Sequence, residues 1–115
     1  MAYTFQSRAT ADLIMLEASA KQILKILEKT PGESGILTVE QIPHALQQLE
    51  QAVALDEARR RELHQQAQSG DPRDVAAAAA ASAELGSVTL RQRVAPLTDI
   101  LRRSAAEGKP VTWKV

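Results

Sequence analysis

Three side chains that could do chemistry, Asp56, Arg60 and His64, continue one face of a predicted helix beyond its apolar part. The apolar part of that face consists of Ile42, Ala45, Leu46, Leu49, Ala52 and Val53. Asp56 and Arg60 are four residues apart, so on a helix they can form an ion pair that contributes about 0.3–0.5 kcal/mol. One interpretation is a polar recess or partner surface lined by Asp56, Arg60 and His64. The other is that the helix extends past the core, which leaves all three side chains solvated.

Arg93 is a fourth candidate, because it is predicted to lie at the edge of the apolar stripe of the last helix. A guanidinium group keeps its charge, so at the edge of a core it needs a carboxylate, carbonyl groups or water at its tip. Arg93 could therefore bind an anion, or it could extend to solvent or pair with a carboxylate such as Asp12 or Glu17.

Metal, nucleophile and phosphate-loop patterns are all missing from the chain. Cysteine is absent, and the two histidines, His44 and His64, lack the spacing of metal ligands. No serine lies in a nucleophile-elbow pattern, and the turn with Gly32 and Gly35 lacks the Lys and following Ser or Thr of a phosphate-binding loop. We predict no catalytic residue, no metal and no cofactor. The pattern favours a protein that is not an enzyme, with an enzyme that uses a carboxylate beside His64 as the alternative.

Length and charge limit the function classes further. A chain of 115 residues predicts one domain, residues 1–115, and its 14 basic and 14 acidic side chains give a formal net charge of zero. That balance argues against a dedicated nucleic-acid binder and a polybasic membrane-surface protein. No apolar run is long enough to cross a bilayer, and residues 1–8 lack the apolar region of a signal peptide, so we expect a cytoplasmic protein.

The elements that must position these side chains begin with strands near both chain ends. Tyr3 and Phe5 alternate with polar residues over residues 2–7, and Trp113 lies in a second alternating segment, residues 111–115. Two isolated strands would leave backbone groups unsatisfied, so we expect them to pair. The three aromatic side chains are candidates for core packing between sheet and helices, or for a dimer interface through an exposed strand.

The region between these strands is predicted to be mainly helical. The apolar run at residues 13–16 favours a short strand in a hairpin with the first strand, and one continuous helix from Ala11 is the alternative. Helices are expected at about residues 18–29, at 43–69 after a capped turn at 38–41, at 72–85 with Asp71 as cap, and at about 87–107. The predicted fold is α+β, a small antiparallel sheet of the N-terminal strand or strands and the C-terminal strand, covered by about four helices.

Several segments resemble one known family. They are Ala11-Asp12 with Ile14-Met15, Ala20 with Ile23-Leu24-Lys25, the turn at residues 31–36, Glu40-Gln41-Ile42-Pro43 with Ala45-Leu46, Leu90-Arg91-Gln92-Arg93 with Pro96-Leu97, and Val111-Thr112-Trp113. Together they resemble small bacterial proteins of the domain-of-unknown-function family number 1840. The resemblance extends over essentially the whole chain and supports the fold, and it implies no activity, cofactor or catalytic residue.

The sequence thus favours a non-catalytic interaction or structural module that self-associates. Its expected partner is a second copy in a homodimer, or another protein. An exposed strand edge and a core poor in aromatic residues motivate this hypothesis. The alternative is a small-ligand or anion-binding regulatory protein in which Arg93, Arg60 and His64 converge on the ligand.

Overall fold

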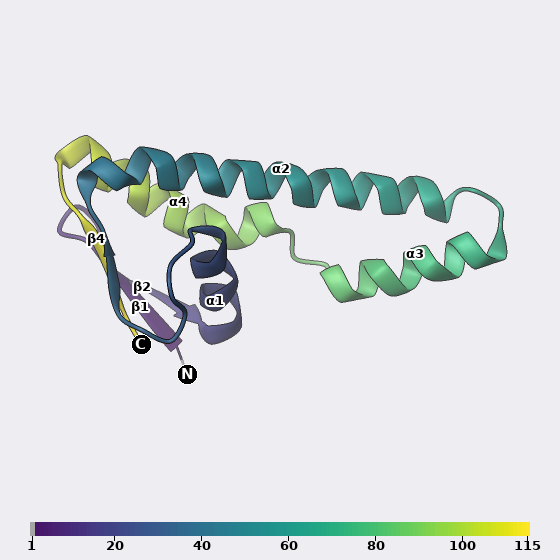
Figure 1. The fold of residues 1–115 in the computed structure, drawn as a ribbon, viewed down its shortest axis with the longest axis horizontal. Helices are drawn as coiled ribbons and strands as arrows, with labels where there is room; N and C mark the ends of the chain where they lie inside the picture. Colours follow the sequence, from purple (N-terminus) through teal and green to yellow (C-terminus); the bar gives the residue numbers. More distant parts are fainter. Residues whose placement is uncertain (1) are drawn as a thin grey trace. The chain divides into compact units, whose positions relative to one another are not determined.

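The computed structural model describes residues 2–115 and has the α+β class that the sequence predicts (Figure 1). In chain order its elements are β1 (Ala2–Gln6), β2 (Leu13–Leu16), α1 (Glu17–Ile26), β3 (Gly35–Leu37), the 3-10 turn η1 (Val39–Gln41), α2 (Ile42–Ala67), α3 (Pro72–Leu85), α4 (Leu90–Glu107) and β4 (Val111–Lys114).

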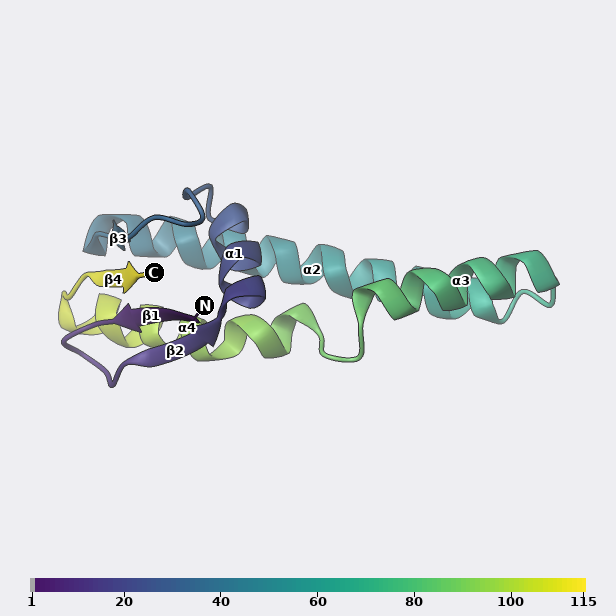
Figure 2. The same cartoon turned by 90° about the horizontal axis from the view of Figure 1, so that it is seen from below.

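The sheet has four antiparallel strands in the order β2-β1-β4-β3. The pairing predicted for the strands near the two chain ends is confirmed, since β1 and β4 are neighbours at its centre, with Phe5 opposite Trp113. Figure 2 shows β1 between β2 and β4.

The apolar run at residues 13–16 is a strand, β2, paired with β1, and α1 begins only at Glu17. The alternative of one continuous helix from Ala11 is therefore wrong. Pairing favours the strand over the helix, because the backbone of Leu13–Leu16 forms hydrogen bonds with β1 and the Met15 side chain is buried in the core.

Two details of the predicted fold need correction. The strand β3 was not expected, because its three residues are too few to show an alternating pattern and its stability comes from pairing with β4. The prediction that about four helices cover the sheet is also too high, because only α1, α2 and α4 contribute to the compact unit that contains the sheet.

Helix boundaries follow local signals that the sequence carries. Thr38 and Gln41 form the predicted capping box, and the Thr38 N–H donates to Gln41 Oε1 at 3.0 Å. Asp71 caps α3, since its carboxylate accepts a hydrogen bond from the Arg73 N–H at 2.9 Å, and Pro72 stands at the first helical position.

The chain divides into two compact units, residues 1–50 with 94–115 and residues 51–93. The first boundary falls inside α2 and the second inside α4, so both helices contribute to both units, while α3 belongs wholly to the second. The expectation of one domain stays a prediction.

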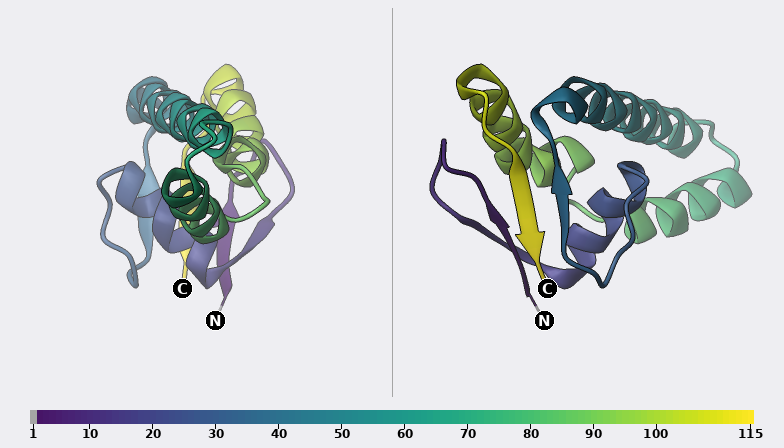
Figure 3. Two further views of the ribbon diagram at one scale, coloured as in Figure 1. Left: turned by 90° about the vertical axis from the view of Figure 1, so that its right-hand side faces the viewer. Right: turned by 60° about the vertical axis from the view of Figure 1, so that its left-hand side comes forward.

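In the first unit, one face of the sheet carries the core. Figure 3 shows the helices of this unit on one side of the sheet, and the sheet side chains that point to that side are buried: Tyr3, Phe5, Met15, Leu37, Val111 and Trp113. Ala20, Ile23 and Leu24 of α1 are fully buried as well. Among the helices of residues 2–115, none combines the length and apolar character needed to cross a membrane.

Candidate functional site

The structure brings Asp56 and Arg60 together in the second unit. Arg60 Nε donates to Asp56 Oδ2 at 2.9 Å, and the two side chains are only 24% and 12% exposed, respectively. If the helix simply extended past the core, both side chains of this pair would be solvated. Their low exposure shows that they are not.

Both side chains of this pair also contact the ends of neighbouring helices. Arg60 donates to the carbonyl oxygen of Leu85, the last residue of α3, at 3.3 Å. It also donates to the carbonyl oxygens of Gly86 at 2.8 Å and Val88 at 3.3 Å, just after that helix. Asp56 Oδ2 accepts the Leu90 N–H at 3.1 Å, at the start of α4. The Arg60 cation thus lies at the negative end of the α3 helix dipole, and the Asp56 anion lies at the positive end of the α4 helix dipole.

His64 lies one turn beyond this pair and is exposed. Its Nε2 is 3.1 Å from Nε2 of Gln68. Arg60 and His64 line one hollow of about 320 Å³, together with apolar side chains such as Leu63 and Val75. A ligand in that hollow could contact His64. Arg60 already donates hydrogen bonds to Asp56 and to the three carbonyl groups.

Arg93 is half-buried and lies near the same turn. Its Nη2 is 3.7 Å from the position that a Cβ on Gly86 would take, and Gly86 has a φ of +80°. Asp56, Arg60 and Arg93 therefore surround the link between α3 and α4.

A second ion pair, between Glu57 and Arg91, lies on the surface of this unit. Arg91 Nη2 and Glu57 Oε1 are 3.0 Å apart, and both side chains are substantially exposed. The hydrogen bond from Arg91 lowers the pKa of the Glu57 carboxyl below its ordinary value. The pair adds a pH-dependent contact between α2 and α4 within this unit.

The three aromatic side chains occupy the core of the first unit. The Gly32 N–H donates to the Tyr3 hydroxyl at 2.7 Å, and Trp113 Nε1 donates to the Glu33 carbonyl at 3.2 Å. The rings of Phe5 and Trp113 have centroids 6.0 Å apart. Each ring is at most 2% exposed, so the polar atoms of Tyr3 and Trp113 fix the loop before β3.

The opposite face of the sheet is open, and its most exposed apolar side chains lie on the edge strand β2. Ile14 is 72% exposed and Leu16 is 77% exposed, while Met15 between them is buried. Ile36 on the other edge strand is 45% exposed. Sequence reasoning singled out none of these residues, although the unbroken run Leu13-Ile14-Met15-Leu16 carried the signal, because a half-buried strand would alternate with polar residues.

The chain matches a known protein family over nearly its whole length. The sequence model of a family described as "Domain of unknown function (DUF1840)" matches residues 1–113 of the chain. No curated protein and no solved structure matches.

Proposed function

The chain belongs to the DUF1840 family, and we propose that this member is a non-catalytic interaction module that forms a homodimer through its edge strand β2. The observation that carries the proposal is the combination of an open strand edge with two exposed apolar side chains, Ile14 and Leu16.

The edge strand β2 lacks the usual protection against pairing. Within residues 2–115 it pairs only with β1, so every second residue of β2 points its N–H and C=O groups away from the sheet. Edge strands commonly carry a charge, a proline or a bulge that blocks pairing with another chain. The four residues Leu13–Leu16 contain neither a charge nor a proline.

A second copy is the occupant that this edge fits best, because the strand is complementary to itself. In an antiparallel pair of β2 strands, a two-fold axis at Met15 keeps the buried faces of both sheets on the same side. Ile14 would then stand opposite the partner subunit's Leu16, and Leu16 opposite the partner subunit's Ile14. Each of these side chains would bury part of its apolar surface against the other, which is the symmetric interface of a two-fold dimer.

The aromatic residues support a protein partner over nucleic acid. Proteins that bind single-stranded nucleic acid on an open sheet stack bases on exposed aromatic rings. Here the one Tyr, one Phe and one Trp of the chain all face the core.

We also propose a cytoplasmic location, which the absence of cysteine suits because that compartment is reducing.

Light scattering coupled to size-exclusion chromatography tests the dimer. At high micromolar concentration we expect the mass of a dimer. Ile14→Lys and Leu16→Lys should each shift it to a monomer, because each introduced charge would stand opposite an apolar side chain of the partner subunit. Leu55→Lys is the matched control, since Leu55 is 74% exposed on α2 in the other unit, and it should stay dimeric. A monomeric parent protein, or equal loss of dimer in all three variants, would refute the proposed edge pairing.

A ligand-binding regulator is the second candidate, supported by the hollow that Arg60 and His64 both line. It ranks below the dimer because Arg60 already donates to Asp56 and to three carbonyl groups. A ligand in this hollow is expected to shift the Val75 methyl resonances, and His64→Ala should abolish these shifts and leave folding unchanged.

A further inference from the structure

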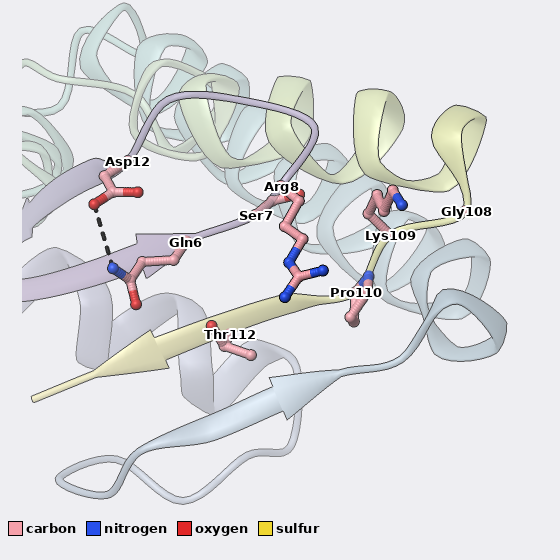
Figure 4. Close-up of a pocket in the computed structure, with 8 residues that line it drawn as sticks. All are labelled: Gln6, Ser7, Arg8, Asp12, Gly108, Lys109, Pro110 and Thr112. Atoms are coloured by element: carbon pink, nitrogen blue, oxygen red, sulfur yellow. Dashed lines mark hydrogen bonds between the residues drawn. The ribbon is translucent and has the colours of Figure 1, made fainter.

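A hollow of about 590 Å³ lies in the first unit, where the loop after β1 meets the link between α4 and β4 (Figure 4). Its volume is within the range of sites for small molecules. Two basic residues, Arg8 and Lys109, line it, and Figure 4 shows the Arg8 side chain extended across β4 toward Pro110 and Thr112. None of these residues was a candidate from the sequence.

Neither basic side chain is used elsewhere in the fold. Across residues 2–115, no hydrogen bond or ion pair engages the Arg8 guanidinium or the Lys109 ammonium. The one carboxylate that lines the hollow, Asp12, accepts a hydrogen bond from Gln6 Nε2 at 3.3 Å. The hollow therefore contains two available cations and one carboxylate, which gives its lining a formal charge of +1.

A buried serine holds the segments that carry the two cations. Ser104 is 0% exposed, and its Oγ is 2.7 Å from Oγ of Ser7, the residue before Arg8. The carbonyl oxygen of Ser104 accepts the Lys109 N–H at 2.8 Å, which completes a Schellman turn with Gly108 in a left-handed conformation. Ser104 thus fixes the backbone beside both Arg8 and Lys109, while the two side chains themselves are exposed.

We propose that this hollow binds the phosphate monoester group of a small phosphorylated molecule. A phosphate monoester carries about −1.5 to −2 charges at pH 7 and three strong acceptor oxygens, so it can accept hydrogen bonds from both cations at once. The planar guanidinium of Arg8 can donate two parallel hydrogen bonds to phosphate oxygens, and Lys109 adds a point charge. Thr112 lines the hollow as well, and Asp12 with Gln6 can accept hydrogen bonds from hydroxyl groups on the rest of the ligand. The proposal is independent of the β2 dimer.

Isothermal titration calorimetry of the full chain with glucose 6-phosphate tests the site at constant ionic strength. We expect saturable binding that Arg8→Gln and Lys109→Gln each weaken by about tenfold or more, since each variant removes charge-assisted hydrogen bonds. Lys25→Gln is the matched control, because Lys25 is an exposed lysine of the same unit outside the hollow, and it should change the affinity by less than about twofold.

Three comparison ligands identify the group that is recognised. Glucose should not bind, and glucuronate, which carries one carboxylate, should bind about tenfold more weakly than glucose 6-phosphate. Vesicles that contain phosphatidic acid present the same phosphate monoester on a lipid, and tight binding to them without binding of glucose 6-phosphate would overturn a small-molecule ligand. Absence of saturable binding to both glucose 6-phosphate and the vesicles would overturn the site itself, as would Arg8 and Lys109 variants that bind as tightly as the parent protein.

Discussion

The Asp56–Arg60 pair is expected to stabilise the second unit far more than an ordinary surface ion pair does. Arg60→Met keeps the length of the side chain and removes its four hydrogen bonds, two of which are 2.9 Å or shorter. A hydrogen bond to a charged group contributes about 1.5–3 kcal/mol. The side chain is 24% exposed and two of the four bonds are long, so we expect a total loss of about 3 kcal/mol.

Urea denaturation followed by circular dichroism at 222 nm measures this loss. Arg59→Met is the matched control, because Arg59 is the preceding residue, is 53% exposed and lies 3.7 Å from its nearest carboxylate, Glu62. It should change the free energy of unfolding by about 0.5 kcal/mol or less. Arg60→Lys should recover only part of the stability, because an ammonium group cannot reach Asp56 and three carbonyl oxygens at once.

A double-mutant cycle separates the ion pair from the contacts to carbonyl groups. With Asp56→Ala, the coupling free energy to Arg60→Met should be about 1 kcal/mol or more, since the two residues are in direct contact. If Arg60→Met costs no more than Arg59→Met, the pair is a surface contact and the reasoning from its burial is refuted.

Three further predictions concern single positions. Gly35→Ala should destabilise the protein by about 1–3 kcal/mol and change the fluorescence of Trp113, because a Cβ at this position would stand against the indole ring; unchanged urea denaturation would contradict the packing described. Glu28→Gly should stabilise the protein by about 1 kcal/mol in the same assay, because Glu28 has a φ of +60° that glycine adopts at no steric cost; a loss of stability would show a contact of the glutamate that outweighs this strain. The pKa of Glu57 is lowered by the hydrogen bond from Arg91, so its contribution is present above its ordinary value of 4.5 and is lost as the pH falls through the lowered value. Thermal melts should therefore show Glu57→Gln less stable than the parent at pH 7 and equal to it at about pH 2, and a difference that persists in acid would exclude this ion pair as its cause.

The parts of the fold that the sequence predicts are those with a local physical signal. Alternation placed β1 and β4, and the capping residues Thr38 and Asp71 marked helix starts to within a residue. The strand β3 carries no such signal, because Gly35–Leu37 is extended only through its pairing with β4 and through the indole ring that covers Gly35.

The candidate sites were less predictable, because they depend on which segments meet. The spacing of Asp56 and Arg60 predicted their ion pair, but the carbonyl groups that Arg60 contacts come from residues about 25 positions later. Arg8 and Lys109 are about 100 residues apart, and the pairing of β1 with β4 together with the contact of Ser7 with Ser104 places their segments side by side. The pattern of charges along a sequence does not show which distant charged residues lie close together in the fold.

The order of strands in the sheet also determines when the protein can fold during synthesis. Among the strands of residues 2–115, β4 comes last in the sequence, and both β1 and β3 pair with it. Until residue 114 has left the ribosome, β3 has no neighbour and the nascent chain contains only the β1–β2 hairpin, whose apolar side chains stay accessible. Completion of the sheet is therefore a late, long-range event, which is expected to make folding slow relative to that of a helical bundle of similar size and to make the unfinished chain dependent on protection from aggregation.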